Sequence, residues 1–408
     1  MKPLGPIPAG FSAIGGELAI AGRTCSALVQ EAGGTPLFVY SADMIRRRMA
    51  DLRAAMPERL HIHYAMKANP YGPILELMAT LADGFDVASG GELEMALAAG
   101  VPAERISFAG PGKRDQELET AIRAGVTINL ESEGEAERVL AICAGEGLKA
   151  RLAVRVNPPF GLKGSGQKMG GLPSQFGVDH DRVPALVRRI VEAGAGWQGL
   201  HIFTGSQALD AGAIIETQAN VLDLAAELAR AIGRPLPHLN MGGGFGIPYF
   251  SGDEPLDVAA VGAALGERFA HLPDELAAAE FAIELGRYLV GEAGVYLTRI
   301  VERKVSHGTV YLITDGGLHH QLAASGNFGT VVRRNYPAAV ASRFAEQPGE
   351  EASIVGCLCT PLDRLADQAL LPRAEVGDLV AIFCAGAYGA SASPAAFLGH
   401  RPAMEMLV

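Results

Sequence analysis

The chain lacks any apolar run long enough to cross a membrane, and its acidic residues outnumber its basic ones. A membrane-spanning helix needs about 20 consecutive apolar residues, and the N-terminal stretch MKPLGPIPAGFSAIGGELA has no continuous apolar core of a secretory signal. The formal net charge of -11 disfavours binding to nucleic acid or to an anionic membrane surface. The sequence therefore predicts a cytoplasmic protein that binds neither nucleic acid nor membranes.

Cysteine is also scarce, with 5 in 408 residues, and no pair of cysteines has the C-x-x-C spacing of a zinc site. An odd number of cysteines without such spacing is typical of reduced cytosolic thiols. His319 and His320 are neighbours in a stretch read as extended, where adjacent side chains point to opposite faces. The sequence therefore predicts no metal site.

What the sequence does contain is an alternation of short apolar runs and helical stretches between residues 60 and 284. Eight strands are expected, at residues 60–64, 84–88, 106–109, 127–130, 152–156, 199–203, 238–241 and 281–284. Strands that alternate with helices in this number predict a (β/α)8 barrel. A doubly wound open sheet is the alternative, but no G-x-G-x-x-G motif follows an early strand.

A second domain is expected because the chain is longer than one hydrophobic core usually supports. Short alternating β segments follow the barrel at residues 294–301, 309–314, 352–355 and 379–385. Strand-like pieces at residues 17–21 and 36–40 are expected to join them. The predicted organisation is N-terminal strands in residues 1–40, a barrel in 41–287 and a C-terminal β domain in 288–408.

Polar residues and glycines fall repeatedly where the barrel strands end, which is where such barrels collect their catalytic groups. Lys67 follows the first strand, and Pro70 prevents further ladder pairing. A lysine there, partly desolvated behind apolar residues, is a candidate nucleophilic amine. The other such residues are Asp86, Arg155, Asn157, His201, Thr204, Gly242, Gly243, Gly244, Glu284 and Arg287.

The residue types at these strand ends indicate one kind of cofactor. Gly242, Gly243 and Gly244 allow backbone N–H groups to approach an anion, and Arg287 adds a forked cation. A lysine, a phosphate cradle and a carboxylate together predict a pyridoxal-phosphate site, with Glu284 keeping the pyridine nitrogen protonated. Two alternatives stay open: the glycines form only a turn, and Glu284 forms an ion pair with Arg287.

Eight motifs in one order carry a family resemblance that spans nearly the whole chain: HYAMKANP, FDVASGGE, RVNP, HIFTGSQ, GGGFGIPYF, ELGRYL, CLCTPLD and AGAYG. They resemble the fold-type III pyridoxal-phosphate decarboxylases, which include the ornithine, arginine and diaminopimelate decarboxylases. The resemblance implies an alanine-racemase-like barrel joined to a β domain. It also implies pyridoxal 5'-phosphate as cofactor and a homodimer with active sites shared between subunits.

The resemblance assigns roles to the residues that match these motifs. Lys67 becomes the Schiff-base lysine, His201 stacks on the cofactor and Glu284 meets the pyridine nitrogen. Cys359 enters from the partner subunit as the proton donor. Further cofactor contacts are implied for Asp86, Arg155, Thr204, Gly243, Gly244, Arg287 and Tyr388. Substrate contacts are implied for Arg287, Thr360, Asp363 and Tyr388.

Departures from the family pattern bear on the substrate. Relatives that act on free diaminopimelate carry an acid directly after the cysteine, and an arginine and a tyrosine further upstream; this chain has Thr360, Ala323 and Asn327 there. It is similar instead to a subgroup with a decarboxylase of carrier-bound glutamate and decarboxylases of exosortase and exopolysaccharide clusters. The favoured hypothesis is decarboxylation of an amino acid that is conjugated or bound to an acyl or peptidyl carrier protein.

Three alternatives remain beside this hypothesis. An amino-acid racemase on the same fold is disfavoured by Glu284, because such racemases place an arginine at the pyridine nitrogen. A diaminopimelate- or ornithine-type decarboxylase would act on a free diamino acid. A cofactor-carrying binding protein without activity is disfavoured because both Lys67 and Cys359 are present.

Overall fold

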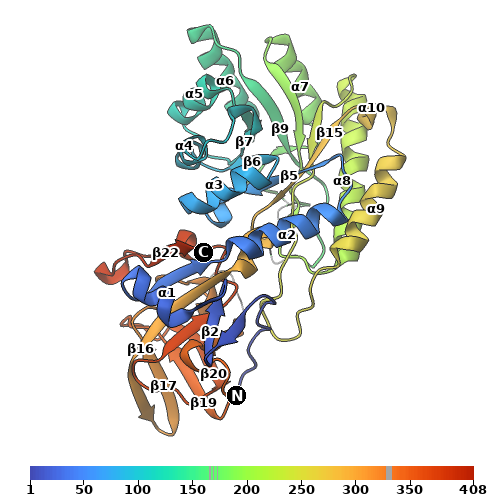
Figure 1. Ribbon diagram of the computed structural model, residues 1–408. Helices are drawn as coiled ribbons and strands as arrows, with labels where there is room; N and C mark the ends of the chain where they lie inside the picture. The colour runs from blue at the N-terminus through green and yellow to red at the C-terminus, as the bar shows by residue number, and fades with distance from the viewer. Residues whose placement is uncertain (165–166, 169, 172, 328–332) are drawn as a thin grey trace. The chain divides into compact units, whose positions relative to one another are not determined.

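The computed structural model describes residues 1–164, 167–168, 170–171, 173–327 and 333–408. It divides into two compact units, and Figure 1 labels many of their elements. The barrel unit comprises Met49–Gly246 and Leu256–Gly286, and the β unit comprises Met1–Arg48, Ile247–Pro255 and Arg287–Val408. The domain boundaries expected from the sequence stay predictions.

In the barrel unit, eight parallel strands of the described chain form a closed ring. Their order follows the sequence, and the last strand pairs with the first through Phe281 and Leu60. The strands are β5 (Leu60–Ala65), β6 (Gly84–Val87), β7 (Ile106–Phe108), β8 (Thr127–Leu130), β9 (Arg151–Asn157), β12 (Gly196–His201), β14 (His238–Asn240) and β15 (Glu280–Leu285). The predicted barrel is therefore confirmed.

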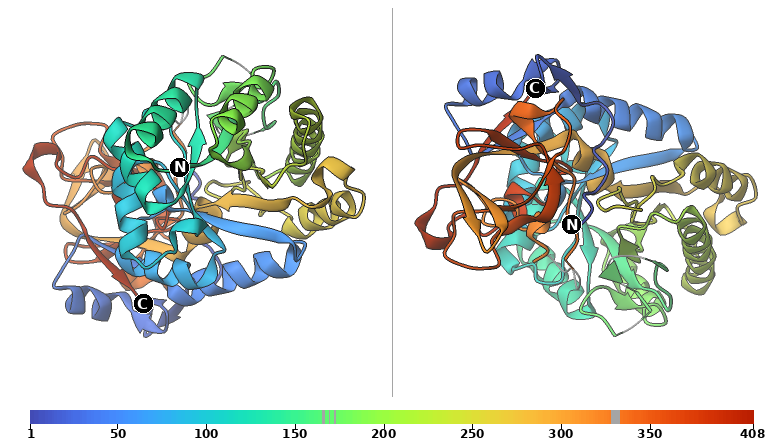
Figure 2. Two further views of the ribbon diagram at one scale, coloured as in Figure 1. Left: turned by 90° about the horizontal axis from the view of Figure 1, so that it is seen from above. Right: turned by 90° about the horizontal axis from the view of Figure 1, so that it is seen from below.

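Helices lie around the outside of this ring (Figure 2). Ser89 and Ser132 cap two of them, because each hydroxyl accepts a hydrogen bond from a backbone N–H in the first turn. The helices are α3 (Gly72–Leu81), α4 (Gly90–Ala98), α5 (Asp115–Ala124), α6 (Glu133–Glu146), α7 (Val183–Glu192), α8 (Ala211–Ile232), α9 (Val258–Ala270) and α10 (Asp274–Ala277). In the described part of the chain, none has the length and apolar character that a membrane span requires.

One barrel strand differs from its expected position. The apolar run predicted a strand at residues 199–203, but β12 covers Gly196–His201, with a register shift between Trp197 and Gly199. Gly199 has a φ of 125°, and a Cβ atom there would lie 2.0 Å from the His238 carbonyl oxygen. The irregular backbone breaks the apolar periodicity that marks a strand, which explains the shifted prediction.

The β unit is built around the long strand β16 (Gly294–Ser306). It pairs antiparallel with β17 (Thr309–Thr314), β21 (Leu379–Ile382) and β4 (Leu37–Tyr40). The pairing with β4 confirms that an N-terminal strand joins the C-terminal β domain. The same sheet contains β18 (Ala338–Val340), β19 (Glu350–Val355), β20 (Arg364–Leu371) and β22 (Met404–Leu407).

The remaining N-terminal strands pack against that sheet rather than extend it. A small antiparallel sheet consists of β1 (Ser12–Ile14), β2 (Glu17–Ile20) and β3 (Arg23–Thr24), followed by α1 (Cys25–Ala32) and later by α2 (Ala42–Ala55). Leu18 and Ile20 share a hydrophobic core with Val295, Leu297 and Phe383. Burial of these apolar side chains holds the N-terminal segment to the β unit.

Candidate active site

The glycine loop after β14 is tightly packed against the end of β15. Gly242 and Gly244 have φ values of 69° and 104°, which favour glycine. A Cβ atom on Gly243 would lie 1.9 Å from the Glu284 carbonyl oxygen, so no larger residue fits without a shift. Asn240 connects the two segments, because its Oδ1 accepts from Gly242 N–H and its Nδ2 lies 3.4 Å from Glu284 Oε2.

Glu284 and His201 face one another at the ends of β15 and β12. His201 Nε2 lies 3.1 Å from Glu284 Oε2, although the two groups lack the alignment of a hydrogen bond. Both side chains are buried. Burial alone would raise the pKa of Glu284, but the interactions with His201, Lys67 and Arg155 lower it to about 2. The carboxylate is therefore ionised at neutral pH.

Asp86, in β6, has a histidine neighbour on the adjacent strand. His63 Nδ1 lies 3.4 Å from Asp86 Oδ2, and neither Asp86 oxygen has a hydrogen-bond partner among the described residues. Burial would lower the pKa of His63, but the Asp86 carboxylate raises it above its ordinary value. The Asp86 carboxylate can therefore accept a hydrogen bond from a further donor.

Lys67 lies in the short 3-10 helix Met66–Ala68, directly after β5, as the proline-containing sequence predicted. Its side chain is exposed in this chain, so the expected partial desolvation is not seen. The ammonium nitrogen lies 5.6 Å from the centre of the Phe203 ring. The amine is thus accessible from the C-terminal end of the barrel strands, with an aromatic face beside it.

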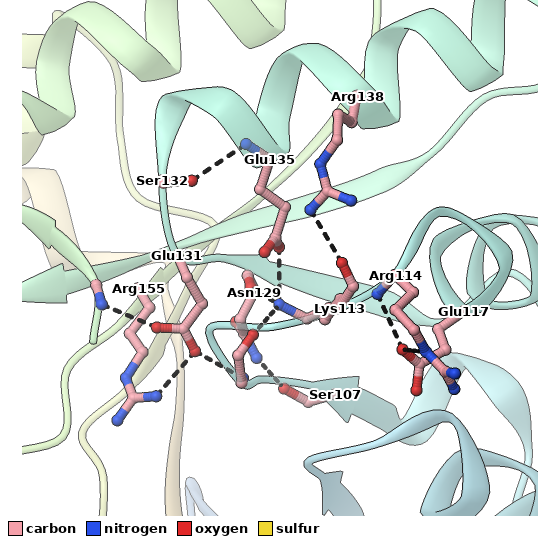
Figure 3. A network of polar contacts seen from close by, with 12 residues as sticks. Ser107, Lys113, Arg114, Glu117, Asn129, Glu131, Ser132, Glu135, Arg138 and Arg155 are labelled. Carbon is pink, nitrogen blue, oxygen red and sulfur yellow. Dashed lines mark hydrogen bonds and ion pairs between the residues drawn. The ribbon is translucent and has the colours of Figure 1, made fainter. Parts of the chain in front are cut away.

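Arg155 belongs to a buried network at the ends of β7, β8 and β9 (Figure 3). Its Nη1 donates to Glu131 Oε1 over 2.9 Å, and Glu131 also accepts from the backbone N–H groups of Gly110 and Gly177. Burial would raise the pKa of Glu131, but Arg155 and Lys113 lower it below its ordinary value. The network holds Arg155 in place, and the charge of Arg155 helps to lower the pKa of Glu284.

A buried lysine, Lys113, is also part of this network. Lys113 Nζ donates to the backbone carbonyls of Gly110 and Asn129 and to Glu135 Oε1, at 2.7 to 2.9 Å (Figure 3). Sequence reasoning missed Glu131 and Lys113. Glu131 directly follows a barrel strand, and this is the same signal that singled out the other site residues.

Other predicted residues take structural positions at the same strand ends. Thr204 is buried, and its carbonyl oxygen lies 3.4 Å from the backbone nitrogen of Leu162. Asn157 ends β9 and donates from Nδ2 to Asp179 Oδ1 over 2.9 Å. Both residues therefore shape the backbone at the C-terminal ends of β9 and β12.

In the β unit, Arg287 is held among aromatic side chains. Its Nη1 donates to the Tyr249 hydroxyl over 2.9 Å, and its guanidinium lies 4.7 Å from the centre of the Tyr388 ring. Burial would lower the pKa of Arg287, but Tyr249 and Tyr388 raise it. Tyr388 has a left-handed backbone with a φ of 56°, a conformation that costs on the order of 1–3 kcal/mol outside glycine.

Cys359, Thr360 and Asp363 lie in the loop between β19 and β20. Cys359 is exposed, and the Thr360 hydroxyl accepts from Leu362 N–H. Asp363 is buried, and its two oxygens accept from the backbone N–H groups of Leu318 and Leu358. This carboxylate therefore fastens the cysteine loop to residues after β17, and a contact with substrate stays a prediction.

The barrel unit fits a pyridoxal-phosphate group. Glu284 is a buried, ionised carboxylate, and the Asp86 oxygens and the His201 ring nitrogens have no hydrogen-bond partner among the described residues. Gly243 has no side chain between its backbone and the surrounding loop, and Lys67 offers an amine at the end of β5. An amine, an anion cradle and an ionised carboxylate are the groups that this cofactor requires.

Comparison with known proteins identifies the class to which this fold and site belong. Residues 42–291 match the family described as "Pyridoxal-dependent decarboxylase, pyridoxal binding domain". The chain belongs to this family and is a pyridoxal-phosphate-dependent amino-acid decarboxylase.

Individual relatives differ in their named substrates. The chain is 36% identical to "L-glutamyl-[BtrI acyl-carrier protein] decarboxylase" of Niallia circulans, with coverage of 91% of this chain and 88% of the relative. It is 30% identical to "2-[(L-alanin-3-ylcarbamoyl)methyl]-2-hydroxybutanedioate decarboxylase" of Staphylococcus aureus, over 89% and 91% of the two chains. The diaminopimelate decarboxylase of M. jannaschii, solved with L-lysine, has a TM-score of 0.88 at 27% identity, covering 98% and 93%.

Proposed function

We propose that this decarboxylase acts on an amino acid whose far end is joined through a neutral amide or thioester link, with a carrier-protein-bound amino acid as the favoured substrate. The observation that carries the proposal is the absence of charge at Thr360, Ala323 and Asn327. These residues stand where the sequence resemblance places the groups that grip a free diamino acid.

The surroundings of these three residues support the proposal. Ala323 is buried and has only a methyl side chain, and the Asn327 amide donates to Ser325 Oγ over 2.7 Å. The Thr360 hydroxyl accepts a hydrogen bond from the N–H group of Leu362, two residues further along the chain. A buried ammonium or carboxylate without a partner costs several kcal/mol. A neutral conjugated end avoids that cost.

Two relatives have names that point to the same kind of substrate. The Niallia circulans enzyme is named for a glutamyl group on an acyl-carrier protein, and the name of the Staphylococcus aureus enzyme contains an alanin-3-yl group in a carbamoyl link. In both names the amino acid is joined to a larger group. The M. jannaschii structure, a diaminopimelate decarboxylase, instead favours the alternative of a free diamino acid.

Within the barrel unit, each proposed role follows from the position of the side chain. Pyridoxal phosphate, when bound, supplies an aldehyde for the substrate amine and a ring that accepts the electron pair left by carbon dioxide. Lys67 Nζ would hold the aldehyde before substrate arrives, and the ionised Glu284 carboxylate would keep a proton on the ring nitrogen. The N–H groups of Gly243 and Gly244 and the backbone near Thr204 would bind the phosphate.

The remaining barrel residues would orient these groups. His201 would lie against the ring while its Nε2 stays close to Glu284 Oε2, and Asp86 would accept a hydrogen bond beside it. Arg155, fixed by Glu131, lowers the pKa of Glu284 and so favours its ionised form. These residues would orient the cofactor and keep Glu284 ionised, and none of them would exchange a proton with the substrate.

Four residues of the β unit complete the proposal. Arg287 and Tyr388 would contact phosphate and substrate, and Asp363 would hold the loop that carries Cys359. Cys359 would deliver a proton to the substrate Cα from the partner subunit of a homodimer. Its exposed position in a single chain is compatible with that assignment. Turnover of carrier-bound against free amino acids by the purified holoenzyme tests the substrate proposal.

A further inference from the structure

Three side chains from distant parts of the β unit converge on one point that the decarboxylase site does not use. They are His319 in the turn after β17, Cys357 in the loop after β19, and His400 just before β22. Their potential ligand atoms all lie within 4.8 Å of one another, and Cys357 Sγ lies 3.9 Å from His400 Nε2. We call these three residues the His–Cys–His cluster.

The separations approach those of a tetrahedral zinc site. Zinc–nitrogen and zinc–sulfur bonds of about 2.0 to 2.3 Å place tetrahedral ligand atoms roughly 3.3 to 3.8 Å apart. A contraction of up to about 1.5 Å, within the reach of side-chain rotation, would bring the cluster to that geometry. Two imidazoles and one thiolate form a ligand set that suits Zn²⁺ better than the oxygen-preferring Mg²⁺ or Ca²⁺.

His319 supplies an independent indication of a missing partner. Its side chain is 0% exposed, yet neither ring nitrogen has a hydrogen-bond partner among the described residues. The adjacent His320 is satisfied, because its ring nitrogens lie 3.1 Å from the Tyr296 hydroxyl and 2.8 Å from the Arg401 carbonyl oxygen. A buried imidazole without a partner is costly, and a metal ion would accept one of its lone pairs.

This arrangement differs from the one expected from the sequence. His319 and His320 were expected to point to opposite faces of a strand, but they lie in a turn, with ring centres 3.8 Å apart. His319 is directed toward His400, whose ring centre is 4.7 Å away. The turn therefore brings His319 to the cluster while His320 contacts other partners.

We propose that His319, Cys357 and His400 form a Zn²⁺ site, with water as the fourth ligand. The Cys357 thiol, whose sulfur now lies 3.6 Å from the Asp315 carbonyl oxygen, would release its proton to solvent as the sulfur–zinc bond forms. The ion would connect the turn after β17 with the loop after β19. That loop also carries Cys359, and Asp363 already fastens it at Leu358 and Leu318.

The zinc site would therefore stabilise the loop that bears Cys359, whatever substrate the enzyme uses. Cys357 is two positions before Cys359, so a fixed sulfur at 357 restricts the backbone of the exposed cysteine. Metal binding can be measured without turnover, so failure of the zinc proposal and failure of the substrate proposal are distinguishable.

The test is metal binding by the holoenzyme with Zn²⁺ alone, after removal of adventitious metal by a chelator and gel filtration. We expect one zinc ion per chain, and a sulfur-to-metal charge-transfer band when Co²⁺ replaces Zn²⁺. Cys357→Ser, which keeps the size of the side chain, should abolish that band. It should also weaken Zn²⁺ binding by more than the roughly 10- to 100-fold that loss of a supporting hydrogen bond causes. His400→Gln should weaken binding similarly.

Two serine variants are matched controls. Cys359→Ser changes the exposed neighbour in the same loop, and Cys143→Ser changes a half-buried thiol of the barrel unit. Both should retain zinc and the charge-transfer band, and circular dichroism should show all variants folded. A wild-type holoenzyme that binds no zinc after this treatment would overturn the proposal. So would loss of zinc in Cys359→Ser with retention in Cys357→Ser.

Discussion

The imidazole of His201 lies 3.1 Å from the carboxylate of Glu284, and both side chains are buried in the barrel unit. This contact, with the charges of Lys67 and Arg155, overcomes burial and lowers the pKa of Glu284 to about 2. A carboxylate with such a pKa is ionised at neutral pH. It can therefore keep a proton on a bound pyridine nitrogen without losing its own charge.

Glu284→Gln should retain the fold and bind cofactor but lower kcat by roughly 100-fold or more, the cost of removing one preorganised electrostatic group. A neutral amide cannot hold a proton on the ring nitrogen. Steady-state decarboxylation and the absorbance of bound cofactor would measure the two effects. Glu280→Gln is the matched control, because it makes the same change at the exposed start of the same strand.

Equal kcat values for wild type and Glu284→Gln would show that another group stabilises the electron pair. Because the Glu284 pKa is lowered to about 2, the ionisation of this residue should also produce no acid limb in the pH profile of kcat above about pH 4.

Glu131→Ala should reduce the free energy of unfolding by about 3 kcal/mol, because it leaves Arg155 buried without its carboxylate. Urea unfolding would measure the change. Glu137→Ala is the control, since Glu137 pairs with Arg189 at the surface, where water and salt screen the pair and leave it little effect on stability. Similar losses in the two variants would contradict a special role for the network of Figure 3.

The effect of Glu131 should depend on pH in a defined direction. Its pKa is lowered in the folded chain from an ordinary value of 4.5. The stabilisation is therefore fully present above that ordinary value and is lost as the pH falls through the lower, folded pKa. The difference between wild type and Glu131→Ala should shrink in acid, and a difference that grows in acid would contradict this assignment.

Much of the barrel was predictable because its signals are local. Strand-like stretches such as Leu60–Ala65 and Thr127–Leu130 are followed within two positions by a charged residue, and the strand positions follow from such short patterns. The bulge at Trp197 and Gly199 was not predictable, because its cause is the close approach of His238 from a neighbouring strand.

Candidate site residues could be named from the sequence, but the residues they contact could not. Glu131 and Arg155 are 24 positions apart, and His201 contacts Glu284 across an intervening strand. Such pairings depend on strand order and side-chain packing rather than on local pattern. The exposure of Lys67 was mispredicted for the same reason, because neighbouring residues in the sequence do not report how the folded chain covers an amine.

Lys67→Ala and Cys359→Ala should each lose turnover while they remain folded, because both side chains are exposed and contribute little to the core. Mixed after subunit exchange, the two proteins should regain up to about a quarter of wild-type activity. Half of randomly formed dimers are hybrids, and each hybrid has one intact site because both lesions fall in the other.

Lys163→Ala, which removes an exposed lysine paired with Glu216, should keep full activity and serves as the control. Borohydride reduction of the wild-type holoenzyme should fix the cofactor on the peptide that contains Lys67. No recovery after verified subunit exchange would place Cys359 in the site of its own chain. A labelled peptide with another lysine would remove Lys67 from its proposed role.

The most direct test of the substrate proposal is the ratio of kcat/KM values for conjugated and free amino acids with the same holoenzyme. A glutamyl group on a purified acyl-carrier protein should be turned over at least tenfold more efficiently than free diaminopimelate, ornithine or lysine. The reason is that Thr360, Ala323 and Asn327 offer no charge to a free far end. A kcat/KM for free diaminopimelate or ornithine on the order of 10⁴ M⁻¹s⁻¹ or more, equal to or above that of the carrier-bound substrate, would contradict the proposal.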